Sequence, residues 1–148
     1  KEKSMNKLAL AAILMVATTG LSMAQADTDA TIKYRKAAFT VAGWNMGILG
    51  GMLKGEIDYN ADEAVAAATR INEMAKAVGA TFVEGTYEGT NASPKIAENR
   101  ADFDSKLAAF VEQSNAMVSA ASEKGTMAAQ MGKLGGTCKS CHDAYKLD

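Results

Sequence analysis

The sequence has no excess of positive charge, no long apolar run and no strand-like alternation, and each absence excludes a class of protein. Its 16 basic and 17 acidic residues nearly balance without a basic patch, which argues against a nucleic-acid partner or a membrane surface. The apolar run at residues 8–16 is far shorter than the roughly 18 residues that span a bilayer. Without alternation of apolar and polar residues, helices are the expected secondary structure.

The N-terminal residues have the order of an export signal. Three lysines within residues 1–7 precede the apolar run, and Ala24 and Ala26 then supply small residues two positions apart. This order is typical of a secretory signal peptide, with cleavage expected after Ala26. We therefore expect residues 1–26 to be removed and residues 27–148 to form one domain in the periplasm, with a net charge of −3 from 13 basic and 16 acidic residues.

Four later stretches carry apolar residues at helical spacing. We expect helices at residues 27–54, at 61–78, from about 95 to 124, and over 127–145. Most connections between them are short, which predicts an all-α, antiparallel up-down-up-down four-helix bundle. The exception is residues 79–93, a stretch before the only proline, and loops of that length in compact domains are often functional.

Local signals mark the ends of the expected helices. Residues 27–29 offer capping side chains and negative charge where the first helix should begin, which suits the helix dipole. Asn60, with Glu63 three positions later, resembles a capping box for the second helix. Gly55 should end the first helix directly after Lys54, and Lys124 with Gly125 should end the third.

The first helix also contains four interior glycines, each of which costs about 1 kcal/mol relative to alanine. The expected reason for tolerating this cost is that another helix approaches closely at these positions, which lack a side chain. That helix could be the second helix of the same chain or one of a partner chain. The four positions are Gly43, Gly47, Gly50 and Gly51.

The only two cysteines and the only histidine lie together near the C-terminus, as Cys138, Cys141 and His142. Two cysteines three apart, followed at once by histidine, are typical of a c-type haem attachment site. On a helix both thiols lie on one face and can form thioethers with the two vinyl groups of one porphyrin. His142 can then present a ring nitrogen to the iron as the axial ligand.

The same pair of cysteines has two other interpretations. Exported thiols at this spacing could form a disulfide, and a thioredoxin-like redox pair would also place two cysteines three apart. The redox pair expects a βαβ pattern near the motif, and none is visible. Instead, the cysteines continue a seam of apolar residues with steps of 4, 3, 4, 3 and 4, which predicts a haem inside the bundle. The seam consists of Met127, Met131, Leu134, Cys138, Cys141 and Tyr145.

The order of the motifs resembles a known family. The attachment motif stands at the C-terminal end and continues to Tyr145, while Tyr34 and Arg35 lie in a first helix that ends in glycines and Lys54. On these residues, residues 27–148 resemble cytochrome c′, the class II c-type cytochromes. Most class I cytochromes c show the reverse order, with the motif near the N-terminus and a methionine ligand downstream.

The resemblance implies a role for Phe39, which is four residues after the arginine of the Tyr-Arg pair and would line the distal face of the haem. Relatives with methionine there are six-coordinate, low-spin cytochromes of the c-556 type. A phenylalanine cannot donate an electron pair, so it implies a five-coordinate, high-spin iron with an apolar sixth site. Without the resemblance, Phe39 would be ordinary core, and Met46, two turns further along, is the rival axial ligand.

The resemblance also implies roles for polar residues around the haem. Arg35 would bind a propionate through its guanidinium, Lys36 would line the haem edge, and Asn91 in the long connection would touch the haem. Relatives often carry arginine where this chain has Lys146, next to the proximal histidine. Lysine keeps the charge but lacks the planar guanidinium, so proximal ligand chemistry should differ.

Taken together, these features predict a periplasmic haem protein that binds NO, and CO, at an apolar distal site and exchanges single electrons with an unidentified redox partner. The alternative is a conventional low-spin electron carrier with Met46 as sixth ligand. An enzyme such as a peroxidase would want a distal acid–base group, and the chain has no second histidine. The resemblance further implies a homodimer packed through the first two helices.

Overall fold

The computed structural model describes the backbone of residues 5–147 and the side chains of residues 27–147. The predicted signal peptide, residues 1–26, lies outside the residues whose side chains are described, and its cleavage stays a prediction. Within the described part of the chain, no helix is both long enough and apolar enough to cross a membrane.

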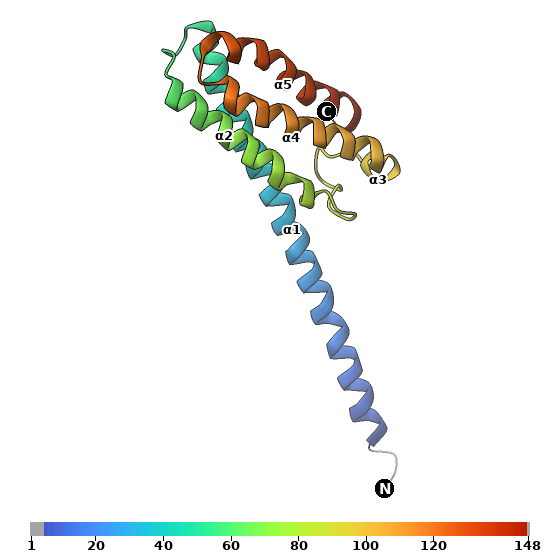
Figure 1. The fold of residues 1–148 in the computed structure, drawn as a ribbon. Helices are drawn as coiled ribbons and strands as arrows, with labels where there is room; N and C mark the ends of the chain where they lie inside the picture. The colour runs from blue at the N-terminus through green and yellow to red at the C-terminus, as the bar shows by residue number, and fades with distance from the viewer. Residues whose placement is uncertain (1–4, 148) are drawn as a thin grey trace.

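Four long helices form an antiparallel bundle, and the described residues contain no strand (Figure 1). The predicted all-α four-helix architecture is confirmed. A 3₁₀ turn, η1, and a short helix, α3, lie in the connection between the second and third long helices. The elements are α1 (Met5–Lys54), α2 (Ala61–Val78), η1 (Gly79–Thr81), α3 (Lys95–Glu98), α4 (Arg100–Ala120) and α5 (Lys124–Tyr145).

Both ends of the connection between α1 and α2 agree with the sequence signals. Gly55 has φ of +79°, a left-handed conformation that glycine adopts without steric cost, and α1 ends at Lys54 as predicted. The side chain of Asn60 accepts a hydrogen bond from the backbone N–H of Glu63 at 2.9 Å, which confirms the predicted N-cap of α2. The sequence predicts a first helix that begins at residues 27–29, but α1 is continuous through Asp27. Residues 27–29 could cap a helix only if cleavage after Ala26 made them its N-terminal end.

The third predicted helix begins near Lys95 as expected, but it is not continuous and its predicted end is wrong. It is interrupted at Asn99, whose φ of −123° and ψ of 44° are not helical, so that α3 and α4 are separate. It ends at Ala120 instead of Lys124, because the tight turn that follows is held by side chains. The hydroxyl of Tyr59 donates to the carbonyl of Ala121 at 2.8 Å, and the hydroxyl of Thr126 donates to the carbonyls that flank the turn.

The glycines of α1 do not lie against another helix of this chain. Apart from the adjoining residues and backbone of α1 itself, no described atom lies within 4 Å of the position that a Cβ would take at Gly43, Gly47 or Gly50. Only Gly51 is approached closely, by the side chain of Ile57 in the connection, 2.9 Å from such a Cβ. The interpretation that these glycines admit α2 is therefore wrong.

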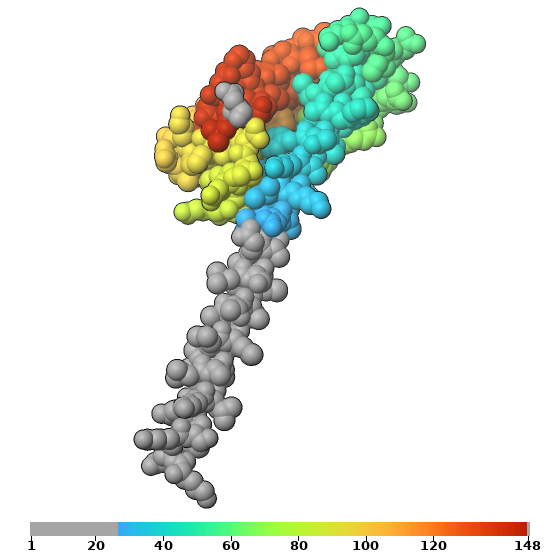
Figure 2. All heavy atoms as spheres, turned by 180° about the vertical axis from the view of Figure 1, so that it is seen from behind, coloured from blue at the N-terminus to red at the C-terminus, as the bar shows by residue number. Residues whose placement is uncertain are grey.

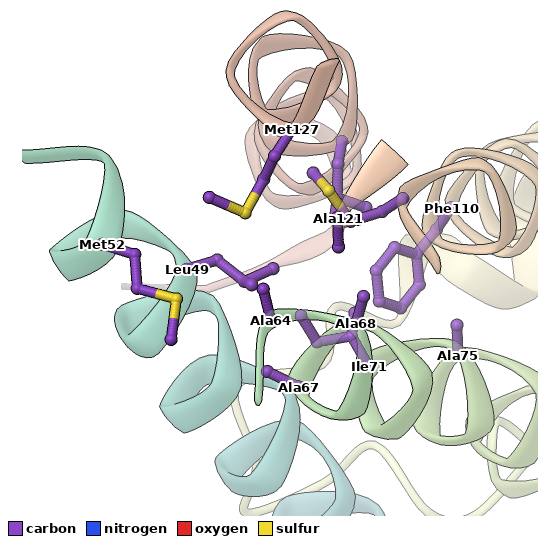
Figure 3. Close-up of a cluster of buried hydrophobic side chains, with 12 residues drawn as sticks. Leu49, Met52, Ala64, Ala67, Ala68, Ile71, Ala75, Phe110, Ala121 and Met127 are labelled. Atoms are coloured by element: carbon purple, nitrogen blue, oxygen red, sulfur yellow. The ribbon is translucent and has the colours of Figure 1, made fainter. Parts of the chain in front are cut away.

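Two clusters of buried apolar side chains hold the bundle together. The larger one joins all four long helices, and alanines of α2 allow them to approach closely (Figure 3). Burying each leucine or methionine there contributes roughly 1.5–3 kcal/mol. The smaller cluster joins the long connection to the ends of α4 and α5. The larger consists of Leu49, Met52, Ala64, Ala67, Ala68, Ile71, Ala75, Phe110, Met117, Ala121, Met127 and Leu134; the smaller, of Ala38, Val78, Phe82, Tyr87, Ile96, Phe103 and Tyr145.

The helices are not packed equally around the bundle. The pairs α1 and α2, α2 and α4, and α4 and α5 are in extensive contact, whereas α1 and α5 barely touch. Figure 2 shows this side of the molecule, where the described part of α1 and the C-terminal helix border a hollow.

Candidate haem site

The space between α1 and α5 is a cavity of about 600 Å³ with mostly apolar walls. Its volume lies within the range of roughly 300–1,000 Å³ that is usual for ligand pockets. Every long helix and the connection between α2 and α4 contribute to the wall. All seven predicted site residues line it, although they come from three separate parts of the chain: Arg35, Lys36, Phe39, Asn91, Cys138, Cys141 and His142.

Cys138 and Cys141 lie three residues apart on α5 and are both partly buried. Their thiols are free, so the disulfide interpretation does not describe this structure. Burial raises the pKa of both thiols above the ordinary value, and the neighbouring Cys138 raises that of Cys141 further. Both side chains are therefore neutral thiols at pH 7, presented on one face of the helix to the cavity.

His142 follows on the same helix and is exposed on one side while it lines the cavity. Partial loss of solvent lowers the pKa of the imidazole, and the positive charge of Lys146 lowers it further, against an opposing effect of Asp143. The neutral imidazole is thus favoured at pH 7, and this is the form that offers a nitrogen lone pair to a metal. The described residues contain no cluster of three metal-ligating side chains, so any iron here would depend on a porphyrin for its other ligands.

Phe39 and Met46, the two candidates for the distal side, both line the cavity from α1. The ring of Phe39 is 39% exposed and meets Phe82 edge-on, with the ring centroids 6.2 Å apart. Met46 is partly buried and packs against the larger apolar cluster. The structure brings both side chains to the same cavity.

Arg35 also lines the cavity, but its guanidinium already has partners in the protein. The side chain is only 3% exposed. One terminal nitrogen donates to the carbonyl of Thr81 at 2.8 Å and to the hydroxyl of Thr86 at 2.9 Å, and the other donates to the carbonyl of Thr86. Burial lowers the pKa of Arg35. Arg35 therefore joins α1 to the long connection while it contributes positive charge to the cavity wall.

Asn91 and Lys36 differ in how they are held. Asn91 fastens the long connection to the C-terminus, since its side-chain amide donates to the carbonyl of Leu147 at 3.1 Å and the backbone N–H of Leu147 donates back at 2.8 Å. Ala92 and Lys146 form an antiparallel bridge beside this pair. Lys36 is exposed at the rim, and its ammonium has no hydrogen-bond or ion-pair partner within the described part of the chain.

Among the wall residues that the sequence did not single out, Phe82 and Lys106 matter most for the site. Phe82 lies in the irregular connection, where no periodicity indicated which side chains point inward. Lys106 was foreseeable, because it shares the inward face of α4 with Phe103, Leu107 and Phe110 at helical spacing. Its ammonium is 2.9 Å from the carboxylate of Asp102.

The lining has the chemistry that a c-type haem requires. Apolar side chains suit a porphyrin ring, two thiols suit its vinyl groups, and a neutral imidazole suits its iron. Among the residues whose side chains are described, four cationic side chains and no carboxylate line the cavity, which suits the propionates. The cations are Arg35, Lys36, Lys106 and Lys146.

Comparison with known sequences agrees with this interpretation. The family model described as cytochrome C' matches residues 30–146. A cytochrome c′ of Cereibacter sphaeroides is 35% identical to this chain over 144 residues, which cover 93% of this chain and 96% of the relative.

Solved structures have the same fold. The cytochrome c′ of Shewanella frigidimarina matches with a TM-score of 0.77 at 35% identity, over 82% of this chain and 97% of its own. A ferrous variant of the cytochrome c′ of Alcaligenes xylosoxidans with bound NO matches with a TM-score of 0.76 at 31% identity, over 82% and 96% of the two chains. With an attachment motif, a cavity to suit it and relatives that span nearly the whole described domain, the chain belongs to the cytochrome c′ family, whose members bind haem c covalently.

Proposed function

We propose that this chain holds one haem c in the cavity between α1 and α5, attached through Cys138 and Cys141, with His142 as the axial ligand. One observation carries the proposal. The fold brings these three residues of α5 and Phe39 of α1, which are about a hundred positions apart in the chain, to the wall of one apolar cavity. The haem would supply an iron that takes up or releases one electron and binds small gases.

Phe39 makes the distal side apolar and without a ligand atom. Its ring has no electron pair to donate, which leaves a five-coordinate, high-spin iron, and it offers no hydrogen bond to bound O₂. NO needs no polar pocket to bind ferrous haem, so NO and CO are the proposed ligands. The NO-bound structure of the Alcaligenes xylosoxidans relative supports this choice.

The cations of the wall divide into those that are engaged and those that are free. Arg35 is committed to the long connection, and Lys106 pairs with Asp102. Lys36 and Lys146 are exposed and without a side-chain partner in the described residues. We propose that Lys36 pairs with a propionate directly, while Arg35 contributes charge from a fixed position.

A role in gas binding and electron exchange fits this wall better than an enzyme does. The described lining contains no carboxylate and no histidine besides His142, so it lacks the distal acid–base group that peroxide cleavage usually employs. With export through the predicted signal peptide, the protein would act in the periplasm as an NO-binding haem protein that exchanges single electrons.

A low-spin electron carrier remains the second candidate, because Met46 lines the same cavity. A thioether ligand would fill the sixth position and prevent gas binding.

We also propose a homodimer that uses the open side of α1. Trp44 is 73% exposed. Val41 lies three positions before Trp44, and Tyr34 lies seven positions before Val41, so these exposed side chains form one stripe along α1. Exposed apolar side chains in such a stripe are typical of an interface. Gly47 adds a place beside this stripe where no Cβ blocks a second helix.

One optical experiment separates the two functions. Spectra of the purified ferric and ferrous protein should be those of a high-spin haem, and the ferrous form should take up NO. A low-spin spectrum that is lost when Met46 is replaced by leucine would overturn the five-coordinate proposal and favour the carrier.

A further inference from the structure

We infer that Phe82 is the positioning residue that sets how Phe39 closes the distal side, and that Arg35 holds Phe82 in place to do so. The inference rests on the proposed function, in which Phe39 guards the iron. It adds a residue from the irregular connection that no sequence pattern indicated.

Phe39 is held loosely for a side chain with that role. Its one ring contact among the described residues is Phe82, at 6.2 Å between centroids and an interplanar angle of 65°. An edge-on contact of this kind is favourable. The position of the Phe39 ring therefore depends on where the ring of Phe82 lies.

Phe82, in contrast, is fixed on several sides and is only 7% exposed. The guanidinium of Arg35 lies over its ring, with Cζ 4.9 Å from the centroid, and the ring of Phe103 packs against it at 4.7 Å. Its backbone carbonyl accepts hydrogen bonds from Arg100 at 2.6 Å and from the hydroxyl of Tyr87 at 3.3 Å. Both the ring and the backbone of Phe82 are thus immobilised.

Arg35 connects the fixed ring to the helix that carries Phe39. The two residues are four positions apart on α1 and therefore lie on the same face. The hydrogen bonds from Arg35 to Thr81 and Thr86 bracket Phe82 in the chain, so they tie the connection to α1 at this point. The distance between Phe39 and Phe82 is consequently set by one buried side chain.

This arrangement determines how Phe39 can yield. For a gas molecule to occupy the distal side, the ring of Phe39 must move, and the immobile ring of Phe82 blocks one direction. A smaller side chain at position 82 would open space behind Phe39 and lower the cost of moving it. Loss of one aromatic pair should therefore raise the CO affinity of the ferrous protein by about twofold to tenfold.

A double-mutant cycle on the haem-loaded protein tests this inference. CO affinity and association rate are measured for the parent, Phe82→Leu, Phe39→Ala and the double variant. We expect Phe82→Leu to raise CO affinity in the parent but to have no effect once Phe39 is alanine. Phe110→Leu is the matched control, because Phe110 lines the same cavity without a ring contact to Phe39, so its effect should be equal in both backgrounds.

Two further measurements do not depend on gas binding. A crystal structure of ferrous Phe82→Leu should show the Phe39 ring displaced toward position 82 or in two conformers, and an unchanged ring would overturn the inference. If Phe82→Leu does not fold, Arg35→Lys is the second variant. It keeps the ring of Phe82 but removes the guanidinium that donates hydrogen bonds to Thr81 and Thr86. It should shift CO affinity in the same direction, and an unshifted affinity would contradict the role of Arg35.

The outcomes also separate this inference from the function on which it rests. If Phe39→Ala leaves CO affinity unchanged, Phe39 does not guard the iron, and the proposed distal site fails. If Phe39→Ala raises the affinity but the effect of Phe82→Leu is absent or simply additive, only the positioning role fails.

Discussion

At the scale of single residues, Tyr145 shows how one hydroxyl fastens the cavity wall to a neighbouring helix. Its hydroxyl donates to the carboxylate of Asp102 on α4 at 2.6 Å and approaches the carbonyl of Asn99 at 3.3 Å. This contact lowers the pKa of Asp102, with Lys106 as the second cause. It also raises the pKa of Tyr145 to about 12. The hydrogen bond therefore joins α4 to α5 three residues after His142.

This pair predicts a pH-dependent stability difference. The folded pKa of Asp102 lies below its ordinary value of 3.8, so its contribution is present above that pH and is lost as the pH falls through the folded pKa. Tyr145→Phe should thus be less stable than the parent at pH 7, and the difference should shrink at an acid pH well below 3.8. Urea unfolding of the haem-loaded proteins at both pH values measures it. An equal difference at both pH values would show that Asp102 is not the partner that matters.

The same pair should weaken again at alkaline pH. Because the pKa of Tyr145 is raised to about 12, the hydrogen bond persists at pH 10 and is lost only as the pH approaches that value. Absorbance titration should therefore show the same number of ionised tyrosines at pH 10 to 11 in the parent and in Tyr145→Phe, whereas one more in the parent would contradict the raised pKa of Tyr145.

A third prediction concerns the side chain that we propose faces the iron. Phe39→Met would place a thioether where the parent has a hydrocarbon ring, and a thioether can donate an electron pair to haem iron. We expect the ferric spectrum to change from high-spin to low-spin. Phe39→Leu, which brings no ligand atom, should stay high-spin and serves as the control. A high-spin Phe39→Met would mean that position 39 does not reach the iron.

At this scale, the sequence could predict the residues that carry chemistry but not those that position them. Cys138, Cys141 and His142 form a motif with a chemical requirement, so their neighbourhood in the structure was foreseeable. Phe82 was not, because it lies in a connection without periodicity, and its burial depends on contacts with Arg35 and Phe103. Such contacts join positions that are far apart in the chain and leave no local pattern.

At the scale of elements, some helix ends are fixed by neighbouring residues in the sequence and others by contacts with distant residues. Gly55 and Asn60 act through their own backbone and side chain, so both ends of the first connection could be predicted. The end of α4 is fixed by the hydroxyl of Tyr59, which is 62 positions away from the carbonyl that it contacts. A sequence pattern within α4 could not reveal that contact, and the predicted end was wrong for that reason.

Two glycine substitutions test this account of the elements. Gly55→Ala places a Cβ on a residue with φ of +79° and should destabilise the protein by about 1–2 kcal/mol. Gly125→Ala lies in the first turn of α5 with open space around it, and it should be neutral or stabilising by up to about 1 kcal/mol. Free energies of unfolding in urea compare the two. A neutral Gly55→Ala would show that the connection can rearrange.

At the scale of the whole molecule, the uncovered stripe on α1 predicts the oligomeric state. Trp44→Glu puts a charge at the centre of the proposed interface and should turn a dimer into a monomer at micromolar concentration, because an unpaired charge is costly to bury. Sedimentation velocity of the haem-loaded protein measures this. Val83→Glu, an exposed apolar residue of the long connection, is the matched control and should leave the dimer intact. A parent protein that sediments as a monomer would contradict the proposed interface directly.

The sparse contact between α1 and α5 has a consequence for how this protein matures. Three of the four seams of the bundle consist of side chains packed on side chains, and the fourth is the cavity wall. A chain that has not received its haem therefore has an incomplete core, and whatever binds the folded form adds directly to its stability. Haem attachment should therefore raise the stability of the folded form. Chains that miss it should be degraded preferentially by proteases, so that the amount of protein in the cell follows the supply of haem.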